Sequence, residues 1–273
     1  MPNPHELFRE SVSKLVGAGV PSAQNDARLI FESVLHEPQY MWPSMIDEPD
    51  AEALTSLVAK RAGRVPLQHV LGKMWFYGIE LVAGPQVFSV RPETEVLAHW
   101  AIEKTRPGDS VLDLCTGSGA LALAIAANRG GEVTALELSS EAAEVARLNA
   151  AKNRLNVQVV EADALEPREE WLGKFDVVVS NPPYVPPRRL DPELDFDPPA
   201  ALWGGGEDGL DFIRELIPIA YSYLKPGGYF GMEHDDTQGD QTRKLAADAG
   251  FTGVQTLEDL NGRPRFLTAR KSS

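Results

Sequence analysis

The apolar residues in the first part of the chain recur every three to four positions, which is the spacing of one face of a helix. Leu7, Val12 and Leu15 form one such set, and further sets continue to about residue 62. Several prolines between residues 38 and 49 interrupt the pattern, and proline disrupts the interior of a helix. The pattern therefore predicts a small unit of separate helices.

The pattern changes between residues 65 and 92, where aromatic and β-branched residues replace the helical spacing. An aromatic cluster at residues 74–77 is followed by an apolar run over residues 79–90, which Gly84-Pro85 interrupts. Because this composition is typical of strands, we expect a strand pair here. The predicted division of the chain is a helical domain at residues 1–75, a linking β-hairpin at residues 76–92 and a third domain at residues 93–273.

The third domain alternates short apolar runs with longer runs of helical spacing. The short runs predict strands at residues 110–114, 132–137, 157–161, 175–180, 228–233 and 265–269. The helical spacing predicts helices at residues 120–128, 140–149, 210–224 and 241–249. Such alternation predicts an α/β fold with an open, doubly wound sheet.

Composition and charge narrow the functional classes. The 273 residues are 43% hydrophobic and 24% charged, as in an ordinary globular protein, and the net charge of −14 repels nucleic-acid phosphates and anionic membranes. Cys115 is the only cysteine, and the histidines lack ligand-like spacing, so we expect no disulfide and no metal site. No apolar run approaches the ~18 residues of a membrane span, and no signal peptide precedes the helices. We therefore expect a cytoplasmic protein.

A glycine-rich turn follows the first predicted strand of the third domain. Residues 113–119 read Asp-Leu-Cys-Thr-Gly-Ser-Gly and lead into an Ala/Leu-rich helix. Glycines let the backbone turn sharply and approach a ligand at a helix N-terminus. A turn used only for packing has the same composition, and the third glycine of the dinucleotide fingerprint is absent. The candidate cofactor-binding residues of this turn are Asp113, Cys115, Thr116, Gly117, Ser118 and Gly119.

Carboxylates stand at the ends of the next two predicted strands. Glu137 follows the turn by about 20 residues, where a carboxylate accepts hydrogen bonds from ribose hydroxyls. Asp163 follows the third strand, at the sheet edge where an adenine amino group would donate to it. A simpler interpretation of Glu137 is an exposed residue at the start of the next helix, and a simpler interpretation of Asp163 is a loop or capping residue. Because Asp113, Glu137 and Asp163 end three successive strands, together they favour an adenosine ligand.

Asn181-Pro182-Pro183-Tyr184 directly follows the very apolar predicted strand at residues 175–180. The prolines remove backbone donors and fix φ, which leaves the Asn181 side chain and the Pro182 carbonyl as acceptors in a stiff arch. Two acceptors match the two N–H bonds of a planar NH₂ group, and the Tyr184 ring lines the pocket. The alternative interpretation is a proline-rich turn that binds nothing.

The glycine-rich turn followed by Asn-Pro-Pro-Tyr resembles the S-adenosylmethionine-dependent methyltransferases that modify amide or exocyclic amino nitrogens. Three further segments are similar to the bacterial release factor glutamine methyltransferase family (HemK/PrmC). These segments are Arg91-Pro92-Glu93-Thr94-Glu95, residues 197–210, and the Asp-Leu-Asn-Gly-Arg stretch at residues 259–263. The resemblance covers nearly the whole chain, including the helical domain.

The resemblance implies a Rossmann-like class I methyltransferase sheet with S-adenosylmethionine as cofactor. It implies methylation of the side-chain amide nitrogen (N5) of the glutamine in the Gly-Gly-Gln motif of peptide chain release factors, with the helical domain holding this protein substrate. It assigns catalysis to Asn181, Pro182 and Tyr184, and adds Ala164 and Asn181 to the cofactor-binding residues. The implied substrate-binding residues are Asn181, Pro182, Pro183, Tyr184, Arg91 and Glu93.

Several positions depart from the family pattern. Cys115 stands where the family usually has glycine, and Glu137 where it usually has aspartate. Ala164 replaces an aromatic residue that often follows the acidic one, which removes an adenine-stacking surface. Residues 233–235, Glu-His-Asp, differ from the usual Glu-x-Gly, and the sequence offers no account of His234.

Four other functions share part of this pattern. Adenine-N6 methylation of DNA or RNA uses the same Asn-Pro-Pro-Tyr chemistry on a flipped base. Residues 191–211, however, hold seven acidic residues and no basic one, with only Arg188-Arg189 nearby, a poor surface for phosphates. A ribosomal-protein glutamine methyltransferase shares the amide chemistry, but residues 91–95 resemble the release factor enzyme more closely. A nicotinamide dehydrogenase or a non-catalytic nucleotide-binding module has no use for the arch.

Overall fold

The chain forms two compact units. The computed structural model describes residues 1–187 and 191–273. Within these ranges, the first unit comprises residues 1–74, 83–85 and 191–196, and the second comprises residues 75–82, 86–187 and 197–273. The first unit is thus completed by a short segment from the middle of the third predicted domain. The domain limits expected from the sequence stay a prediction.

The first unit is helical, as the apolar spacing predicts. Its elements are α1 (Pro4–Gly17), α2 (Ala23–Leu35), the 3₁₀ helix η1 (Gln39–Met41), α3 (Glu48–Ala62), α4 (Leu67–Leu71) and the 3₁₀ helix η4 (Pro192–Phe196). Asn3 and Asp47 cap α1 and α3 by accepting hydrogen bonds from backbone amides. Pro49 does not break a helix, because it lies in the first turn of α3, where a missing amide costs nothing. The buried core of this unit includes Phe8, Leu15, Phe31, Trp42 and Leu54.

The strand pair expected between residues 65 and 92 is shorter than the pattern predicts. β1 (Lys73–Phe76) and β2 (Ile79–Val82) form a two-stranded sheet. Tyr77 and Gly78 connect them with φ angles of 48° and 79°, the left-handed conformation of a tight hairpin turn. The expectation of strand over residues 83–90 is wrong, because Gly84-Pro85 ends the ladder and the Ala83 amide donates to the Gly72 carbonyl instead.

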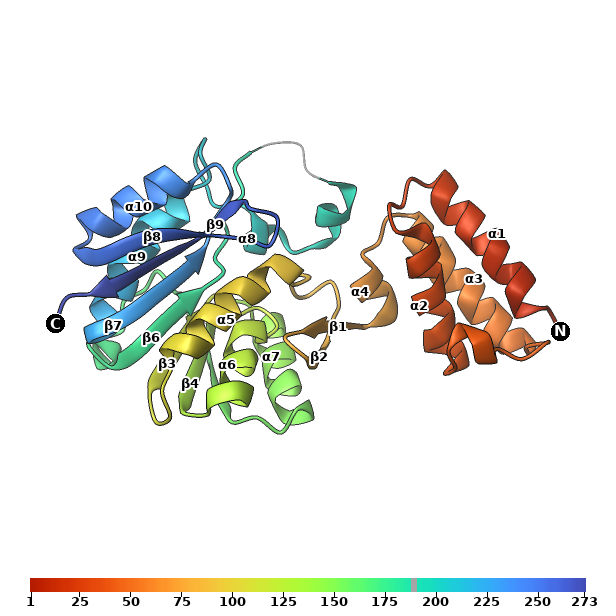
Figure 1. The fold of residues 1–273 in the computed structure, drawn as a ribbon, viewed down its shortest axis with the longest axis horizontal. Helices are drawn as coiled ribbons and strands as arrows, with labels where there is room; N and C mark the ends of the chain where they lie inside the picture. Colours follow the sequence, from red (N-terminus) through yellow and green to blue (C-terminus); the bar gives the residue numbers. More distant parts are fainter. Residues whose placement is uncertain (188–190) are drawn as a thin grey trace. The chain divides into compact units, whose positions relative to one another are not determined.

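The second unit is built on a seven-stranded sheet with the order β5-β4-β3-β6-β7-β9-β8 (Figure 1). Its strands are β3 (Ser110–Leu114), β4 (Glu132–Glu137), β5 (Val157–Glu161), β6 (Phe175–Ser180), β7 (Leu224–Glu233), β8 (Phe251–Glu258) and β9 (Pro264–Lys271). The strands from β5 to β7 pair in parallel, whereas β9 pairs antiparallel with β7 and β8. The predicted doubly wound sheet is therefore confirmed, and β8 is the strand that the apolar pattern missed.

Helices cover both faces of this sheet (Figure 1). The helices of the second unit are α5 (Glu95–Lys104), α6 (Ala120–Arg129), α7 (Ser140–Lys152), α8 (Pro199–Leu202), α9 (Asp211–Tyr223) and α10 (Gly239–Asp248), with the 3₁₀ helices η2 (Pro92–Thr94) and η3 (Glu169–Trp171). Burial on both faces explains why β3 and β6 read as continuous apolar runs. In the described part of the chain, no helix is both long and apolar enough to cross a membrane.

The parallel register brings the functional segments to one edge of the sheet. Leu114, the last residue of β3, pairs with Leu136 on one side and with Ser180 on the other. The Ser180 hydroxyl also donates to the Leu114 carbonyl at 2.7 Å. The chain leaves β3 toward β4 and β5 and returns to β6 on the opposite side of β3. Ligands of open α/β sheets bind at the carboxyl ends of the strands beside such a switch point.

Candidate functional site

The glycine-rich turn leaves β3 and begins α6 with three residues in the left-handed region of φ. Cys115, Gly117 and Gly119 have φ angles of 61°, 56° and 86°. A Cβ atom on Gly117 would meet nothing within 4 Å, so a ligand can approach the backbone here. A Cβ atom on Gly119 would lie 3.3 Å from Leu123 and 3.4 Å from Ala146, so this glycine serves close packing of α6 and α7. The two glycines therefore have different functions.

Two buried polar atoms of the same turn have no hydrogen-bond partner among the described residues, Oδ1 of Asp113 and Oγ of Ser118. The other Asp113 oxygen accepts from the Thr116 hydroxyl at 2.5 Å and from the Ala122 amide at 3.2 Å. Because buried polar groups are nearly always paired, these two atoms indicate the position of a polar ligand. Burial raises the pKa of Asp113 to about 7, against the hydrogen bonds from Thr116 and Ala122.

Glu137 fixes the geometry of the turn from the end of β4. Its Oε2 accepts from the Gly117 amide at 2.8 Å, and its Oε1 accepts from the Ser139 amide at 3.0 Å. Ser139 in turn caps α7. The carboxylate thus lies beside the open surface over Gly117, and each oxygen keeps a further lone pair for a ligand.

Asp163 and Ala164 follow β5 at the same edge of the sheet. Asp163 accepts a hydrogen bond from the Leu165 amide at 2.8 Å and is partly exposed. The Ala164 side chain is buried in the hydrophobic cluster of the second unit, so it packs into the core. The contact of either residue with an adenine ring stays a prediction.

The arch at residues 181–184 is held from behind by a buried polar network. Tyr184 donates its hydroxyl to Oε1 of Glu233 at 2.7 Å, and Thr94 donates to Oε2 of the same carboxylate at 2.6 Å. Gln238 donates to the Tyr184 carbonyl and to the Asp208 carbonyl, both at 2.8 Å. Burial raises the pKa of Glu233 and that of Tyr184. The network fixes both the ring and the backbone of Tyr184.

Backbone packing also presses residues 203–210 against the arch. Val185 donates to the Leu202 carbonyl at 2.8 Å and accepts from the Gly204 amide at 3.2 Å. A Cβ atom on Gly204 would overlap the Gly209 carbonyl and lie 2.8 Å from Cα of Tyr184. A Cβ atom on Gly209 would lie 2.5 Å from the Tyr184 carbonyl oxygen. Only glycine fits at either position.

The residues behind the arch were missed as functional residues by the sequence reasoning. Thr94, Gly204, Gly209 and Glu233 entered the sequence analysis only as parts of family segments, with no role assigned to them. The available signal was the run of three glycines at residues 204–206 inside one of those segments. Gln238 carries no comparable signal.

Among the described residues, the Arg91 side chain donates its hydrogen bond to Asp197 and not to the arch. It donates to Oδ2 of the buried Asp197 at 3.1 Å and lies over the Phe88 ring. Glu93 lies in η2 and is one of the charges that raise the pKa of Glu233. The assignment of Arg91 and Glu93 to substrate binding therefore stays a prediction.

His234, unexplained by the sequence, is fully buried beside the network. Its Nδ1 lies 2.7 Å from the Asp235 carbonyl, which makes Nδ1 the donor of the neutral ring. Burial lowers the pKa of His234.

The acidic stretch at residues 191–211 is not simply a solvated loop. Asp208 and Asp211 both form ion pairs with Arg214. The hydrogen bond from Arg214 lowers the pKa of Asp208. The buried Asp197 pairs with Arg91. The stretch holds no basic residue of its own, and the structure supplies partners for its carboxylates, Arg214 from the adjacent α9 and Arg91 from a distant segment. Arg188-Arg189 lies outside the described residues.

Comparison with protein families finds two matching models. Residues 6–72 match the PrmC N-terminal domain, and residues 78–194 match the methyltransferase small domain. The release factor glutamine methyltransferase of Mycolicibacterium smegmatis is 44% identical over 96% of this chain and 95% of its own length. That of Corynebacterium glutamicum is 42% identical over 97% of this chain and 98% of its own length.

Solved structures agree with the fold. A methyltransferase from Pyrococcus furiosus matches with a TM-score of 0.57 at 22% identity, over 79% of this chain and all of its own. A 16S rRNA N2 G1207 methyltransferase from T. thermophilus, in complex with AdoMet and guanosine, matches with a TM-score of 0.53 at 24% identity. That match covers 73% of this chain and 49% of the rRNA enzyme. At these identities the likeness concerns the sheet and its helices only.

Substitution of Glu137 by alanine is expected to weaken S-adenosylmethionine binding by roughly tenfold or more. The change removes the proposed ribose acceptor and leaves the Gly117 amide without its partner. Glu161→Ala is the matched control, because Glu161 is exposed at the end of β5 and pairs in register with Glu137. Titration calorimetry measures both affinities, and equal losses in the two variants would remove Glu137 from the cofactor site.

Cofactor binding is expected to release a proton from Asp113 near pH 7. The pKa of this carboxyl is about 7 in the free protein, and a cationic ligand beside it favours the ionised form. Affinity should therefore fall as the pH drops below 7. Calorimetry in buffers of different ionisation enthalpy measures the released proton, which Asp113→Asn should abolish. Undiminished release in that variant would contradict the assignment.

The same raised pKa predicts how the stability of the free protein depends on pH. The folded state holds the Asp113 proton up to about pH 7, whereas the unfolded state loses it near the ordinary carboxyl pKa. The contribution of Asp113 to the free energy of unfolding is therefore largest at low pH and is lost as the pH rises through 7. Asp113→Asn should flatten this part of the profile in denaturant titrations.

Substitution of Gln238 by leucine is expected to lower the free energy of unfolding by about 2 kcal/mol or more, because two buried carbonyl oxygens lose their donor. Gln241→Leu is the control, since Gln241 is exposed on the same helix. Urea unfolding measures both variants. Equal stability of the two proteins would show that Gln238 does not support the arch.

Proposed function

This chain belongs to the release factor glutamine methyltransferase family, and on that premise we propose that it methylates peptide chain release factors. The methyl group passes from S-adenosylmethionine to the side-chain amide nitrogen N5 of the glutamine in their Gly-Gly-Gln motif. The sequence match to the relatives extends over nearly the whole of both chains, so both the helical and the methyltransferase parts are present.

The residues of the glycine-rich turn fit the cofactor. S-adenosylmethionine supplies an electrophilic methyl group on a positively charged sulfur, beside polar amino-acid and ribose groups. The unpaired Asp113 Oδ1 and Ser118 Oγ would take polar groups of this molecule, and Glu137 would accept from the ribose hydroxyls. The open surface over Gly117 leaves room for a ligand against the backbone.

The observation that carries the proposal is the position of the arch relative to this turn. Ser180 and Leu114 pair in register at the ends of β6 and β3, so Asn181 and Cys115 begin side by side at the sheet edge. Asn181 is partly exposed, whereas Pro182 and Pro183 are buried. A planar amide held at Asn181 would therefore lie next to the methyl donor.

The arch orients the substrate and accepts its developing charge. A carboxamide nitrogen is a poor nucleophile because its lone pair is delocalised into the carbonyl. The Asn181 side-chain carbonyl and the Pro182 carbonyl would accept the two N–H bonds and draw positive charge from the nitrogen as the new C–N bond forms. Tyr184, fixed by Glu233 and Gln238, packs against the flat group. The nitrogen then loses one proton as the neutral methylamide forms.

The identity of the protein substrate is a more specific proposal than methyl transfer to an amide. The helical unit would hold the release factor, while the arch takes only the glutamine side chain. Nucleic-acid methylation is not favoured, because the net charge of −14 and the acidic residues beside the arch repel phosphates. Because release factors act on bacterial ribosomes, we place the activity in the cytoplasm.

The direct test is methyl transfer from labelled S-adenosylmethionine to three purified acceptors. We expect labelling of an intact release factor and none of the variant whose Gly-Gly-Gln glutamine is replaced. Duplex DNA at physiological salt should be neither labelled nor inhibitory. Labelling of DNA, or equal labelling of the glutamine variant, would overturn the proposed substrate.

Substitution of Asn181 by alanine is expected to lower kcat by ~10²–10³-fold, the usual cost of one preorganised polar contact to the reacting group. The interaction strengthens in the transition state, so kcat falls rather than KM alone rising. The affinity for S-adenosylmethionine should change by less than about tenfold. Steady-state kinetics with release factor provides the measurement. A near wild-type rate would show that the arch is only a rigid turn and does not orient the amide.

A further inference from the structure

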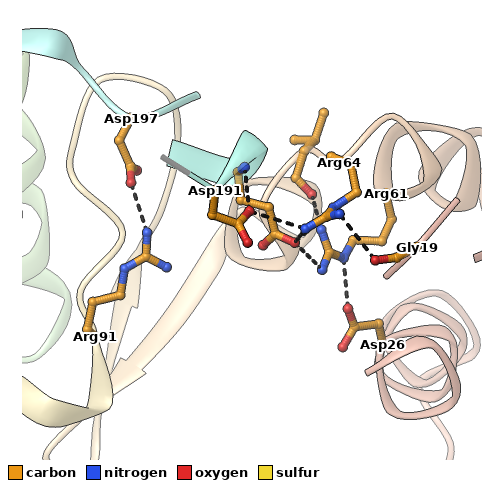
Figure 2. A network of polar contacts seen from close by, with 9 residues as sticks. Gly19, Asp26, Arg61, Arg64, Arg91, Asp191 and Asp197 are labelled. Carbon is orange, nitrogen blue, oxygen red and sulfur yellow. Dashed lines mark hydrogen bonds and ion pairs between the residues drawn. The ribbon is translucent and has the colours of Figure 1, made fainter. Parts of the chain in front are cut away.

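Residues 191–196 are bound to the helical unit by a cluster of ion pairs (Figure 2). Arg61 donates to Glu193 Oε1 at 2.8 Å, and Arg64 donates to the same oxygen at 3.0 Å. Arg64 also donates to Asp191 at 3.2 Å. We call Arg61, Arg64, Asp191 and Glu193 the clasp.

Because the Arg61 side chain is buried, its nitrogen atoms need hydrogen-bond acceptors, and Glu193 is one of them. The Arg61 side chain is 5% exposed, and its other nitrogens donate to Asp26 at 2.7 Å and to the Val65 carbonyl at 3.0 Å. Glu193 satisfies the remaining nitrogen. A buried guanidinium with an unsatisfied N–H is costly, so the helical unit favours the bound position of this segment.

The backbone of the helical unit presents Arg64 for this contact. Arg64 follows the end of α3 with a φ of 65°, a conformation that a side-chain-bearing residue rarely adopts. Its Nη1 donates to the Gly19 carbonyl at 3.1 Å. The Gly19 carbonyl thus holds the guanidinium within the helical unit independently of Glu193, which lowers the entropy cost of the ion pair.

The segment continues directly into the residues that pack on the arch. Asp197 is buried and accepts from the Ser89 amide at 3.0 Å. It also accepts from Arg91 at 3.1 Å (Figure 2). The helix α8 follows, and its last residue, Leu202, accepts from the Val185 amide next to the arch. Charge therefore fixes this stretch of chain at two points, one in each unit.

We propose that Arg61 and Arg64 are positioning residues for methyl transfer to an intact protein substrate, acting through Glu193. The arch itself is held by Glu233 and Gln238, so it does not need the clasp. The clasp instead holds residues 191–196 in the helical unit, and the chain continues from there into the residues that pack on the arch. An intact protein substrate that contacts the helical unit therefore depends on the clasp, whereas a short peptide meets the arch alone. This inference rests on the proposed function.

The test compares Glu193→Gln with Asp195→Asn, which removes the same charge from an exposed neighbour in the same segment. We expect Glu193→Gln to raise the KM for an intact release factor about tenfold, within the usual range of coupling between sites. The kcat/KM for a short Gly-Gly-Gln peptide and the affinity for S-adenosylmethionine should stay unchanged. Asp195→Asn should match the wild type with both substrates.

A double-mutant cycle with Arg64→Met checks that the effect passes through the ion pair. Arg64→Met and Glu193→Gln together should cost less than the sum of the two single changes, because both remove the same ion pair. An unchanged KM in Glu193→Gln, additive effects, or an equal loss on the peptide would overturn the clasp while leaving the enzyme a release factor methyltransferase. Absence of methylation by the wild-type protein would overturn the proposed function instead. The Arg61 position is avoided because its loss would leave Asp26 buried and unpaired.

Discussion

The parallel pairing of β3 with β6 is the constraint on which the candidate site depends. Parallel strands that end in register place the loops that follow them at one edge of the sheet. Leu114 and Ser180 pair there, and the Ser180 hydroxyl locks the two ends together. The glycine-rich turn and the arch, which lie far apart in sequence, begin from this one point. A slip of the register would separate the two halves of the site.

The site also depends on polar groups that are buried away from the reacting atoms. The Glu233 carboxylate lies at the end of β7, where burial raises its pKa, and the hydroxyls of Thr94 and Tyr184 and the charge of Arg265 act against this rise. The side-chain amide of Gln238 donates to the Tyr184 carbonyl and to the Asp208 carbonyl, and so connects the two loops. Such networks are expensive when incomplete. Here both oxygens of Glu233 are paired and Gln238 donates to two carbonyls, which supports the arch that we propose binds an amide.

Some of the acidic residues after the arch have a structural role, because they form ion pairs with arginines. In the sequence they form a run of like charge that disfavours a polyanion. In the structure, Glu193 binds Arg61 and Arg64 within the helical unit. Asp197 binds Arg91 within the second unit. The same charges that disfavour nucleic acid thus also fix the path of the chain beside the site.

The sequence by itself determined the helical first part, the alternating strands and helices, and the residues at the strand ends. Those features follow from local periodicity and from the chemistry of glycine, proline and asparagine, which act over a few residues. Only the tertiary structure decided the short hairpin, the antiparallel β8, and the partners of Tyr184 and Glu193. Glu233, Gln238 and Arg61 are separated from the residues they hold by long stretches of chain. Pairing at such separations depends on how the elements pack, which no local pattern records.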